Sequence, residues 1–132
     1  TRGYPVRIAA NVDFSELKLL YGQASFFWSA AGFGFNELKE PKKMEHLGMT
    51  TCEALSAGGV PCVGNLSGQK EIVTSGEDGY VCKTTHQLQN WTLNMIKHPA
   101  KRHRLAAQAI ITSQRFSLAK FNENFKKIVQ SA

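Results

Sequence analysis

Short apolar runs alternate with amphipathic segments along the 132-residue chain. Apolar runs of a few residues, bounded by turn residues, are typical of buried strands. The predicted strands span residues 6–10, 25–29, 60–63 and 80–82. Because segments with helical periodicity separate them, the sequence predicts an α/β domain with a parallel sheet and flanking helices.

Helices are predicted from apolar residues three or four positions apart and from capping residues. Asp13-x-x-Glu16 has the pattern of a capping box, Gly58 is placed to end a helix over residues 50–57, and Ser117 is placed to cap the last helix. The other expected helices carry Leu17/Leu20/Tyr21, residues 69–74, Leu88/Trp91/Met95, Leu105/Ala109/Ile110 and Leu118/Phe121/Phe125/Ile128. We expect a single domain over residues 1–132, with 117–132 as its closing C-terminal helix.

Two glycine-bearing loops follow the second and third predicted strands. Residues 30–49 form a long loop, and residues 64–68 form a turn. A loop as long as the first is usually functional when it lies inside a compact domain. Ligands of open parallel sheets bind beyond the carboxyl ends of the strands. The sequence therefore predicts a binding site where these two loops meet.

The formal net charge of the chain is +6, and the basic residues gather in two places. The clusters are Lys39, Lys42 and Lys43, and Lys97, Lys101, Arg102 and Arg104. A solvated helix face and a surface for anionic lipid both remain open for the second cluster. No aromatic residue interleaves it, which disfavours a platform for nucleic acid, so we expect no nucleic-acid partner.

The cysteines and the N-terminal residues limit the class of protein. Cys52, Cys62 and Cys82 are odd in number and show no CxxC spacing, so we expect reduced thiols in the cytoplasm and no zinc or other metal site. No apolar run approaches the roughly 18–20 residues that span a bilayer. Residues 1–12 lack the apolar core of a signal peptide and begin without Met, so we expect a fragment of a longer chain.

Two glutamates, Glu45 and Glu53, lie eight positions apart around a predicted helix start. One interpretation is structural, because Thr50-x-x-Glu53 is also a capping-box pattern. The other involves a ligand, because free amides at residues 48–51 would favour an anion such as a diphosphate at the helix N-terminus. Carboxylates accept hydrogen bonds from hydroxyl groups, which a sugar or a ribose offers. The segment therefore suggests a sugar nucleotide.

Three segments, in order, resemble the retaining GT-B glycosyltransferases of family four, the glycosyl transferases of group 1. Glu45-x7-Glu53, followed by A-L-S-A-G-G-V-P-C-V, resembles the E-x7-E signature of that family. Residues 66–83 are similar to its G-G-x-x-E-I-V segment, and F-S-x-x-x-F at residues 116–121 resembles its closing helix. The resemblance spans nearly the whole chain. It implies a Rossmann-like sheet in a truncated C-terminal, donor-binding half of the GT-B fold.

The resemblance also implies roles for the matching residues. Glu45 would be the catalytic residue: it would accept hydrogen bonds from donor-sugar hydroxyls and assist the charge that develops at the anomeric carbon. Glu53 would hold the ribose hydroxyls. The backbone amides that would bind the donor sugar and diphosphate are those of Leu47, Gly48, Met49 and Thr50.

A nucleoside-diphosphate sugar, linked to UDP, GDP or ADP, is the donor that the resemblance implies, with a hexose-type sugar as the group transferred. It implies no cofactor and no metal, and the chain has no DxD-type acidic pair. Retention in this family is usually ascribed to front-face attack, in which the leaving phosphate takes the proton of the acceptor.

The chain departs from the family pattern in sequence and in extent. Leu47 and His46 replace the Phe and Gly of the E-G-F-G turn. The loop that grips the diphosphate and the N-terminal acceptor-binding domain would lie upstream of residue 1. We therefore expect the parent protein to transfer sugar and this fragment alone to be inactive.

The alternative function is a non-catalytic GT-B-like module for interaction or regulation. Many relatives work at the cytosolic face of membranes, so the expected location is the cytoplasm, with peripheral membrane contact left open. The truncated sheet is expected to expose residues 6–10 as an edge strand, which predicts dimerisation or aggregation.

Overall fold

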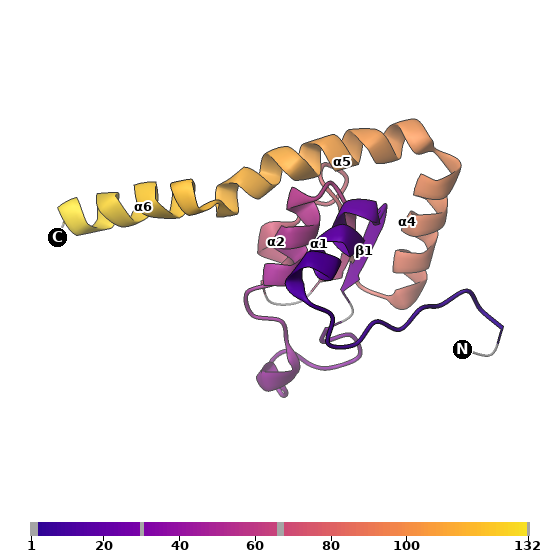
Figure 1. The fold of residues 1–132 in the computed structure, drawn as a ribbon. Coiled ribbons are helices and arrows are strands. Elements are labelled where there is room, and N and C mark those ends of the chain that lie inside the picture. The colour runs from indigo at the N-terminus through magenta and orange to yellow at the C-terminus, as the bar shows by residue number, and fades with distance from the viewer. Residues whose placement is uncertain (1–2, 30, 66–67, 132) are drawn as a thin grey trace.

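The computed structural model of the chain describes residues 3–29, 31–65 and 68–131. Helices and strands alternate over most of this length (Figure 1). The elements are α1 (Phe14–Gln23), β1 (Phe26–Ser29), the 3₁₀ turn η1 (Pro41–Lys43), α2 (Met49–Ser56), β2 (Val60–Gly64), α3 (Gln69–Ile72), β3 (Tyr80–Cys82), α4 (Thr85–Lys97), α5 (Pro99–Ser113), the 3₁₀ turn η2 (Gln114–Phe116) and α6 (Leu118–Gln130).

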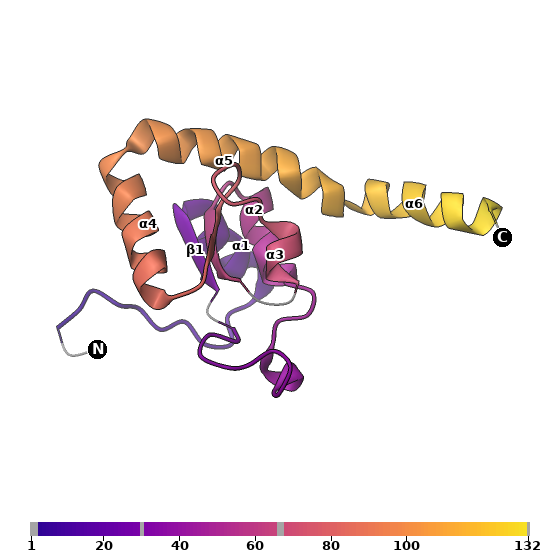
Figure 2. The same cartoon turned by 180° about the vertical axis from the view of Figure 1, so that it is seen from behind.

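The sheet has three parallel strands in the order β1-β2-β3. Phe26 pairs with Val60, and Cys62 pairs with Tyr80. Figures 1 and 2 show α4 on one side of the sheet, α1 and α2 on the other, and α5 running across one edge. The predicted α/β fold with a parallel sheet and flanking helices is confirmed.

Two apolar clusters hold the layers together. Residues alternating along β2 and β3 point into the first cluster, which contains Val60, Cys62, Tyr80, Cys82, Leu88, Met95 and Leu105. The second cluster joins Val63 of β2 to Leu55 of α2 and Ala109 of α5. Burial raises the pKa of the Cys62 thiol to about 12, and all three cysteines are free thiols, as predicted.

The prediction of a strand over residues 6–10 is wrong. This segment is extended but pairs with no strand among the described residues, and the Val6 and Ile8 side chains are 58% and 81% exposed. An apolar run becomes a strand only when a neighbouring strand accepts its backbone hydrogen bonds. The sheet therefore has three strands rather than the four that were predicted.

A buried carboxylate ties the turn before β3 to α5. Asp78 is 2% exposed and accepts hydrogen bonds from the Thr74 amide and the Thr112 hydroxyl, both at 2.8 Å. Buried polar groups are costly unless they are hydrogen-bonded, so these two bonds fix the turn against the helix.

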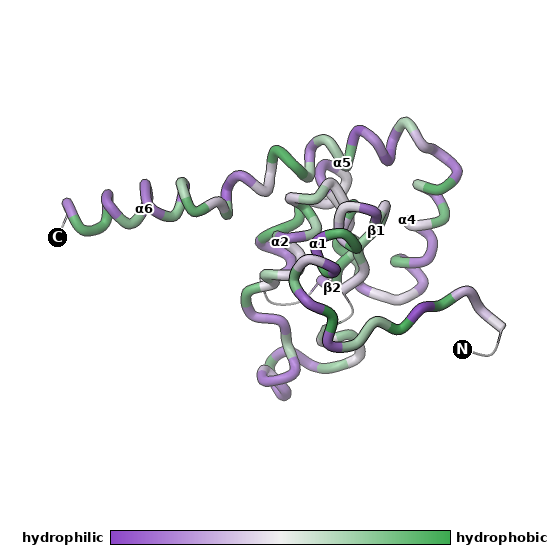
Figure 3. Tube along the Cα trace, viewed as in Figure 1, coloured by the Kyte–Doolittle hydropathy of each residue, from purple (hydrophilic) through white to green (hydrophobic). Residues whose placement is uncertain are grey.

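The helix α6 begins where it was predicted, because the Ser117 hydroxyl accepts a hydrogen bond from the Lys120 amide. Figures 1 and 3 show α6 extending away from the body of the molecule with a strip of apolar residues along it. These exposed residues are Leu118, Phe121, Phe125, Ile128 and Val129.

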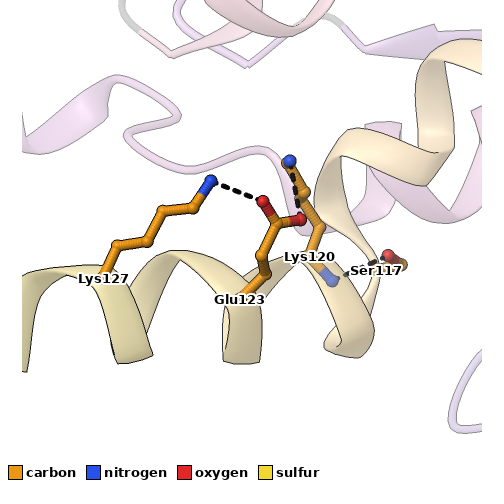
Figure 4. Close-up of polar contacts among 4 residues, drawn as sticks. All are labelled: Ser117, Lys120, Glu123 and Lys127. Atoms are coloured by element: carbon orange, nitrogen blue, oxygen red, sulfur yellow. Dashed lines mark hydrogen bonds and ion pairs between the residues drawn. The ribbon is translucent and has the colours of Figure 1, made fainter.

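The polar side of α6 carries a lysine–glutamate–lysine group (Figure 4). Glu123 lies 2.9 Å from Lys120 and 2.6 Å from Lys127, and these hydrogen bonds lower the pKa of the Glu123 carboxyl to about 2.

Among the described residues, no helix is both long enough and apolar enough to cross a membrane.

Two glycines should respond in opposite ways to replacement by alanine. A Cβ atom at Gly79 would lie 2.6 Å from the Pro61 carbonyl oxygen, so Gly79→Ala should lower the free energy of unfolding by about 1–3 kcal/mol. A Cβ atom at Gly22, in α1, meets nothing within 4 Å, so Gly22→Ala should raise it by up to about 1 kcal/mol. Urea unfolding followed by circular dichroism measures both. Equal effects of the two substitutions would contradict the packing described for Gly79.

Candidate functional site

The carboxyl ends of β1 and β2 lead into the two loops that the sequence singled out. The loop after β1 runs to the start of α2, and the turn after β2 returns to it at Gly68. The Gly68 amide donates to the Glu45 carbonyl oxygen at 3.2 Å, and a Cβ atom at Gly68 would lie 2.2 Å from the His46 carbonyl oxygen. Only glycine permits this approach, which fixes the segment that carries Glu45.

Glu45 closes a tight turn before α2. Its Oε1 atom accepts hydrogen bonds from the Gly48 amide at 2.9 Å and the Leu47 amide at 3.3 Å. Gly48 has a φ of 72°, in the left-handed region. Successive amides that converge in this way form a concave site for an anion, called a nest. Here the anion is the protein's own carboxylate.

The start of α2 differs from the prediction. Gly48, and not Thr50, is the N-cap residue, and the helix begins at Met49. The interpretation of Thr50-x-x-Glu53 as a capping box is therefore wrong, because the left-handed Gly48 starts the helix two residues earlier. Glu53 lies in the second turn of the helix, away from the amides at its start.

The amides of residues 48–51 were also predicted to be free, which is correct for two of them. The Gly48 amide donates to Glu45, and the Thr51 amide donates to the Gly48 carbonyl oxygen at 2.9 Å. Among the described residues, the amides of Met49 and Thr50 meet no acceptor. Both residues are exposed, so these two donors face solvent beside the nest.

Glu53 is half-buried on α2 and contacts α1. Its Oε2 atom accepts a hydrogen bond from the Tyr21 hydroxyl at 3.0 Å. Burial is the largest cause, and the hydrogen bond to Glu53 the next, of a pKa of Tyr21 raised to about 12. The hydroxyl therefore remains a donor at neutral pH. Within the described part of the chain, Oε1 of Glu53 takes no hydrogen bond and remains available as an acceptor.

Two hollows meet at Glu53. One has a volume of about 390 Å³ and is lined by Phe14, Lys18, Tyr21, Gly22, Glu53, Ser56 and Ala57. The other has a volume of about 600 Å³ and is lined by Leu47, Met49, Cys52, Glu53, Arg115, Phe116, Ser117, Phe121 and Asn124. Each hollow therefore combines the Glu53 carboxylate with one basic side chain, Lys18 or Arg115.

Arg115 was not predicted as a site residue. It follows α5, and its guanidinium lies 5.3 Å from the centre of the Phe116 ring while one nitrogen donates to the Glu71 carbonyl oxygen at 3.5 Å. Burial and the charge of Glu53 raise the pKa of the Cys52 thiol, and Arg115 opposes this shift. The opposite charges of Glu53 and Arg115 thus both act at Cys52, inside the larger hollow.

Gln69 is a second residue that the sequence did not single out. Its side chain is 1% exposed, donates to the Ser29 hydroxyl at 3.1 Å and accepts from the Thr51 hydroxyl at 2.7 Å. These bonds join the end of β1 to the starts of α2 and α3. The sequence holds no signal that separates it from its polar neighbours Lys70 and Glu71 in the same short helix.

The structure thus brings five predicted site residues together around the start of α2: Glu45, Leu47, Gly48, Met49 and Thr50. Glu53 lies one turn further along the same helix and shares the larger hollow with Leu47 and Met49. Among the described residues, no group of three or more His, Cys, Asp and Glu side chains is arranged to hold a metal ion.

Comparison with known proteins finds relatives by sequence and by structure. The chain is 26% identical over 126 residues to the GDP-Man:Man(3)GlcNAc(2)-PP-Dol alpha-1,2-mannosyltransferase of Dictyostelium discoideum, which covers 95% of this chain and 24% of that protein. HepE of Anabaena in complex with UDP matches with a TM-score of 0.62 and 25% identity over 67% of this chain and 25% of that chain. The structure of HepE with UDP-glucose matches with a TM-score of 0.59 over the same shares. The chain therefore spans about a quarter of the length of these relatives.

The sheet and its flanking helices match a GT-B, Rossmann-like domain of these glycosyltransferases. The family model for "Glycosyl transferases group 1" matches residues 6–112, which is most of the chain. The chain therefore belongs to the glycosyl transferases of group 1.

Proposed function

We propose that this chain is the donor-binding part of a retaining glycosyltransferase, which transfers a hexose-type sugar from a nucleoside-diphosphate sugar to an acceptor. The observation that carries the proposal is the nest before α2, where the Leu47 and Gly48 amides hold a carboxylate oxygen. Relatives crystallised with UDP and UDP-glucose, and a relative named for GDP-mannose, support a donor of this class.

The diphosphate of the donor is placed at the nest. A phosphate oxygen makes the same kind of hydrogen bond with an amide as the carboxylate of Glu45 does. The free amides of Met49 and Thr50 extend the donor set along the first turn of α2, where the helix dipole favours negative charge. Arg115, in the adjacent hollow, adds positive charge.

Glu45 leaves the nest when the diphosphate enters, because two anions cannot share the same pair of amides. Its carboxylate then accepts hydrogen bonds from hydroxyls of the donor sugar, which lies next to the diphosphate. Negative charge that builds on the leaving diphosphate is stabilised by the amides of the nest and the helix start. This proposed stabilisation comes from backbone amides and would need neither a cofactor nor a metal ion.

Glu53 is the proposed partner of the ribose. Its Oε1 atom is open to a ribose hydroxyl, while Tyr21 holds Oε2 and so fixes the rotamer of the carboxylate. Because Tyr21 keeps its proton, it acts as a positioning residue that never competes as a base.

The rest of the catalytic site is proposed to lie in the parts of the relatives that this chain does not span. These parts would include an N-terminal domain that binds the acceptor, so the chain alone would bind donor without transferring sugar. The basic cluster at the junction of α4 and α5, with Lys97 and Arg104 exposed, is proposed to meet anionic lipid at the cytosolic face of a membrane.

Titration of the chain with UDP, GDP and ADP tests the donor site and identifies the base. One nucleotide should shift the backbone amide signals of Gly48, Met49 and Thr50 in NMR spectra. Glu53→Gln should weaken binding of that nucleotide about three- to tenfold, because a charge-assisted hydrogen bond becomes neutral. Wild type and Glu53→Gln should bind the 2′-deoxy form of that nucleotide with equal affinity. No shift with any of the three, in this chain and in the full-length parent, would overturn the proposal.

Glu45→Gln should strengthen the binding of pyrophosphate about three- to tenfold, because a charged competitor for the nest becomes a neutral one. In the full-length parent the same variant should lose most of its transfer activity, since the donor sugar loses its carboxylate partner. Isothermal titration calorimetry and a transfer assay measure the two effects.

Glu77→Gln is the matched control for this prediction, because it makes the same change of charge at an exposed site elsewhere. Equal strengthening in both variants would show a general effect of net charge. Weaker pyrophosphate binding in Glu45→Gln would contradict the exchange at the nest.

Tyr21→Phe should weaken binding of the preferred nucleotide about three- to tenfold while leaving pyrophosphate binding unchanged, because Tyr21 acts only through Glu53. Tyr4→Phe, which removes an exposed hydroxyl, should leave both affinities unchanged. A loss that affects pyrophosphate as much as the nucleotide would mean that Tyr21 supports the fold of α1 and α2 and does not position Glu53.

A further inference from the structure

A third hollow with the chemistry of a binding site lies on α4, away from the nest. It has a volume of about 320 Å³ and is lined by Gln87, Asn90, Trp91 and Asn94. These residues are spaced three, four and seven positions from the first, so they share one face of the helix. The nest lies at the start of α2, and α4 covers the opposite side of the sheet (Figure 2).

The indole ring of Trp91 is held rigidly on its inner face. It stacks on the Tyr80 ring with a centroid distance of 4.2 Å and an interplanar angle of 9°, and Tyr80 is 2% exposed in the core. Trp91 is 36% exposed and borders the hollow. A buried ring therefore supports the indole from behind and keeps it in one orientation.

Lys101 leaves the outer face of this ring open. Its Nζ atom lies 5.3 Å from the Trp91 centroid and 5.7 Å from the Tyr80 centroid. An atom almost equally distant from two stacked rings lies beside the pair and cannot lie across the outer face of either. The ammonium group is therefore at the rim of the hollow, where it donates to Asn94 Oδ1 at 3.4 Å.

The three carboxamides around the ring keep both donors and acceptors free. Gln87 Oε1 accepts from a backbone amide at 2.7 Å, which leaves its NH₂ group free, and Asn94 Nδ2 likewise has no partner among the described residues. The NH₂ group of Asn90 contacts a histidine ring nitrogen at 3.3 Å, which leaves its Oδ1 atom as an acceptor. The hollow thus offers two amide donors and one amide acceptor around one flat apolar surface.

We propose that this hollow on α4 binds a saccharide ring, as a subsite separate from the donor site. A pyranose presents C–H groups on one face, which pack on an aromatic ring, and hydroxyls on its edge, which both donate and accept. The fixed ring of Trp91 matches the C–H face, and the three carboxamides match the hydroxyls. A purely apolar peptide would leave the carboxamides unpaired, which is costly.

The ligand class is a neutral glycan, because carboxamides outnumber charged groups around the ring. Lys101 is committed to Asn94 and to the edge of the aromatic pair, so it supports the wall of the hollow. The inference does not depend on the donor site, since no residue of the hollow belongs to it.

Titration with maltotetraose and with an α-linked mannotetraose tests the proposal, with backbone NMR signals of the chain as readout. At least one of the two should shift the amide signals of residues 87–94 at an affinity of about 1 mM, which is typical of one shallow sugar contact. The signals of Met49 and Thr50 should not move. Asn90→Ala and Trp91→Ala should each weaken binding tenfold or more, and Trp91→Phe should retain part of it.

Gln89→Ala is the matched control, because it removes an exposed carboxamide from α4 outside the hollow. Its affinity should equal that of the wild type. Binding that survives Trp91→Ala in a variant with an unchanged circular dichroism spectrum would overturn the proposal. So would the absence of shifts in α4 with both oligosaccharides. Neither outcome affects the nucleotide titration, which reports on the amides at the start of α2.

Discussion

The burial of β2 on both faces and along both edges is the constraint on which the rest of the structure depends. All five of its residues are buried, with β1 paired along one edge and β3 along the other. Because the three strands are parallel, each connection must cross back from the carboxyl end of one strand to the amino end of the next. The loop after β1, the start of α2 and the turn at Gly68 are therefore gathered at one edge of the sheet by its topology.

The sequence predicted the elements whose formation is local. The apolar runs at β1, β2 and β3 and the caps at Asp13 and Ser117 depend on residues within a few positions, and the structure confirms them. The strand at residues 6–10 was predicted by the same rule and does not form, because strand pairing requires a partner that the local pattern cannot supply. Its alternating apolar residues remain exposed, so an apolar pattern alone is not sufficient to form a strand.

The candidate site divides in the same way. Glu45, Leu47, Gly48, Met49 and Thr50 are neighbours in sequence, so a motif places them together. Tyr21 bonds Glu53, and Arg115 shares its hollow, from helical segments distant along the chain, and the helical periodicity assigned Tyr21 only to an apolar face. The error at the start of α2 has a single cause, because spacing alone does not reveal that Gly48 takes a left-handed conformation.

The carboxylate in the nest has a consequence for how the site binds anions. The Leu47 and Gly48 amides are already hydrogen-bonded to Glu45, so a diphosphate bound there as proposed would gain only the difference between its own hydrogen bonds and those of Glu45. In this proposal the displaced carboxylate would stay close to the start of α2, where it would repel the diphosphate unless hydroxyl groups or cations compensate. Under the proposed function, a nucleoside diphosphate alone would supply no donor-sugar hydroxyls for Glu45, because its ribose would lie at Glu53, whereas a sugar nucleotide would supply them beside the displaced carboxylate. The proposed exchange would therefore weaken the binding of a bare diphosphate and favour the complete donor over its own leaving group.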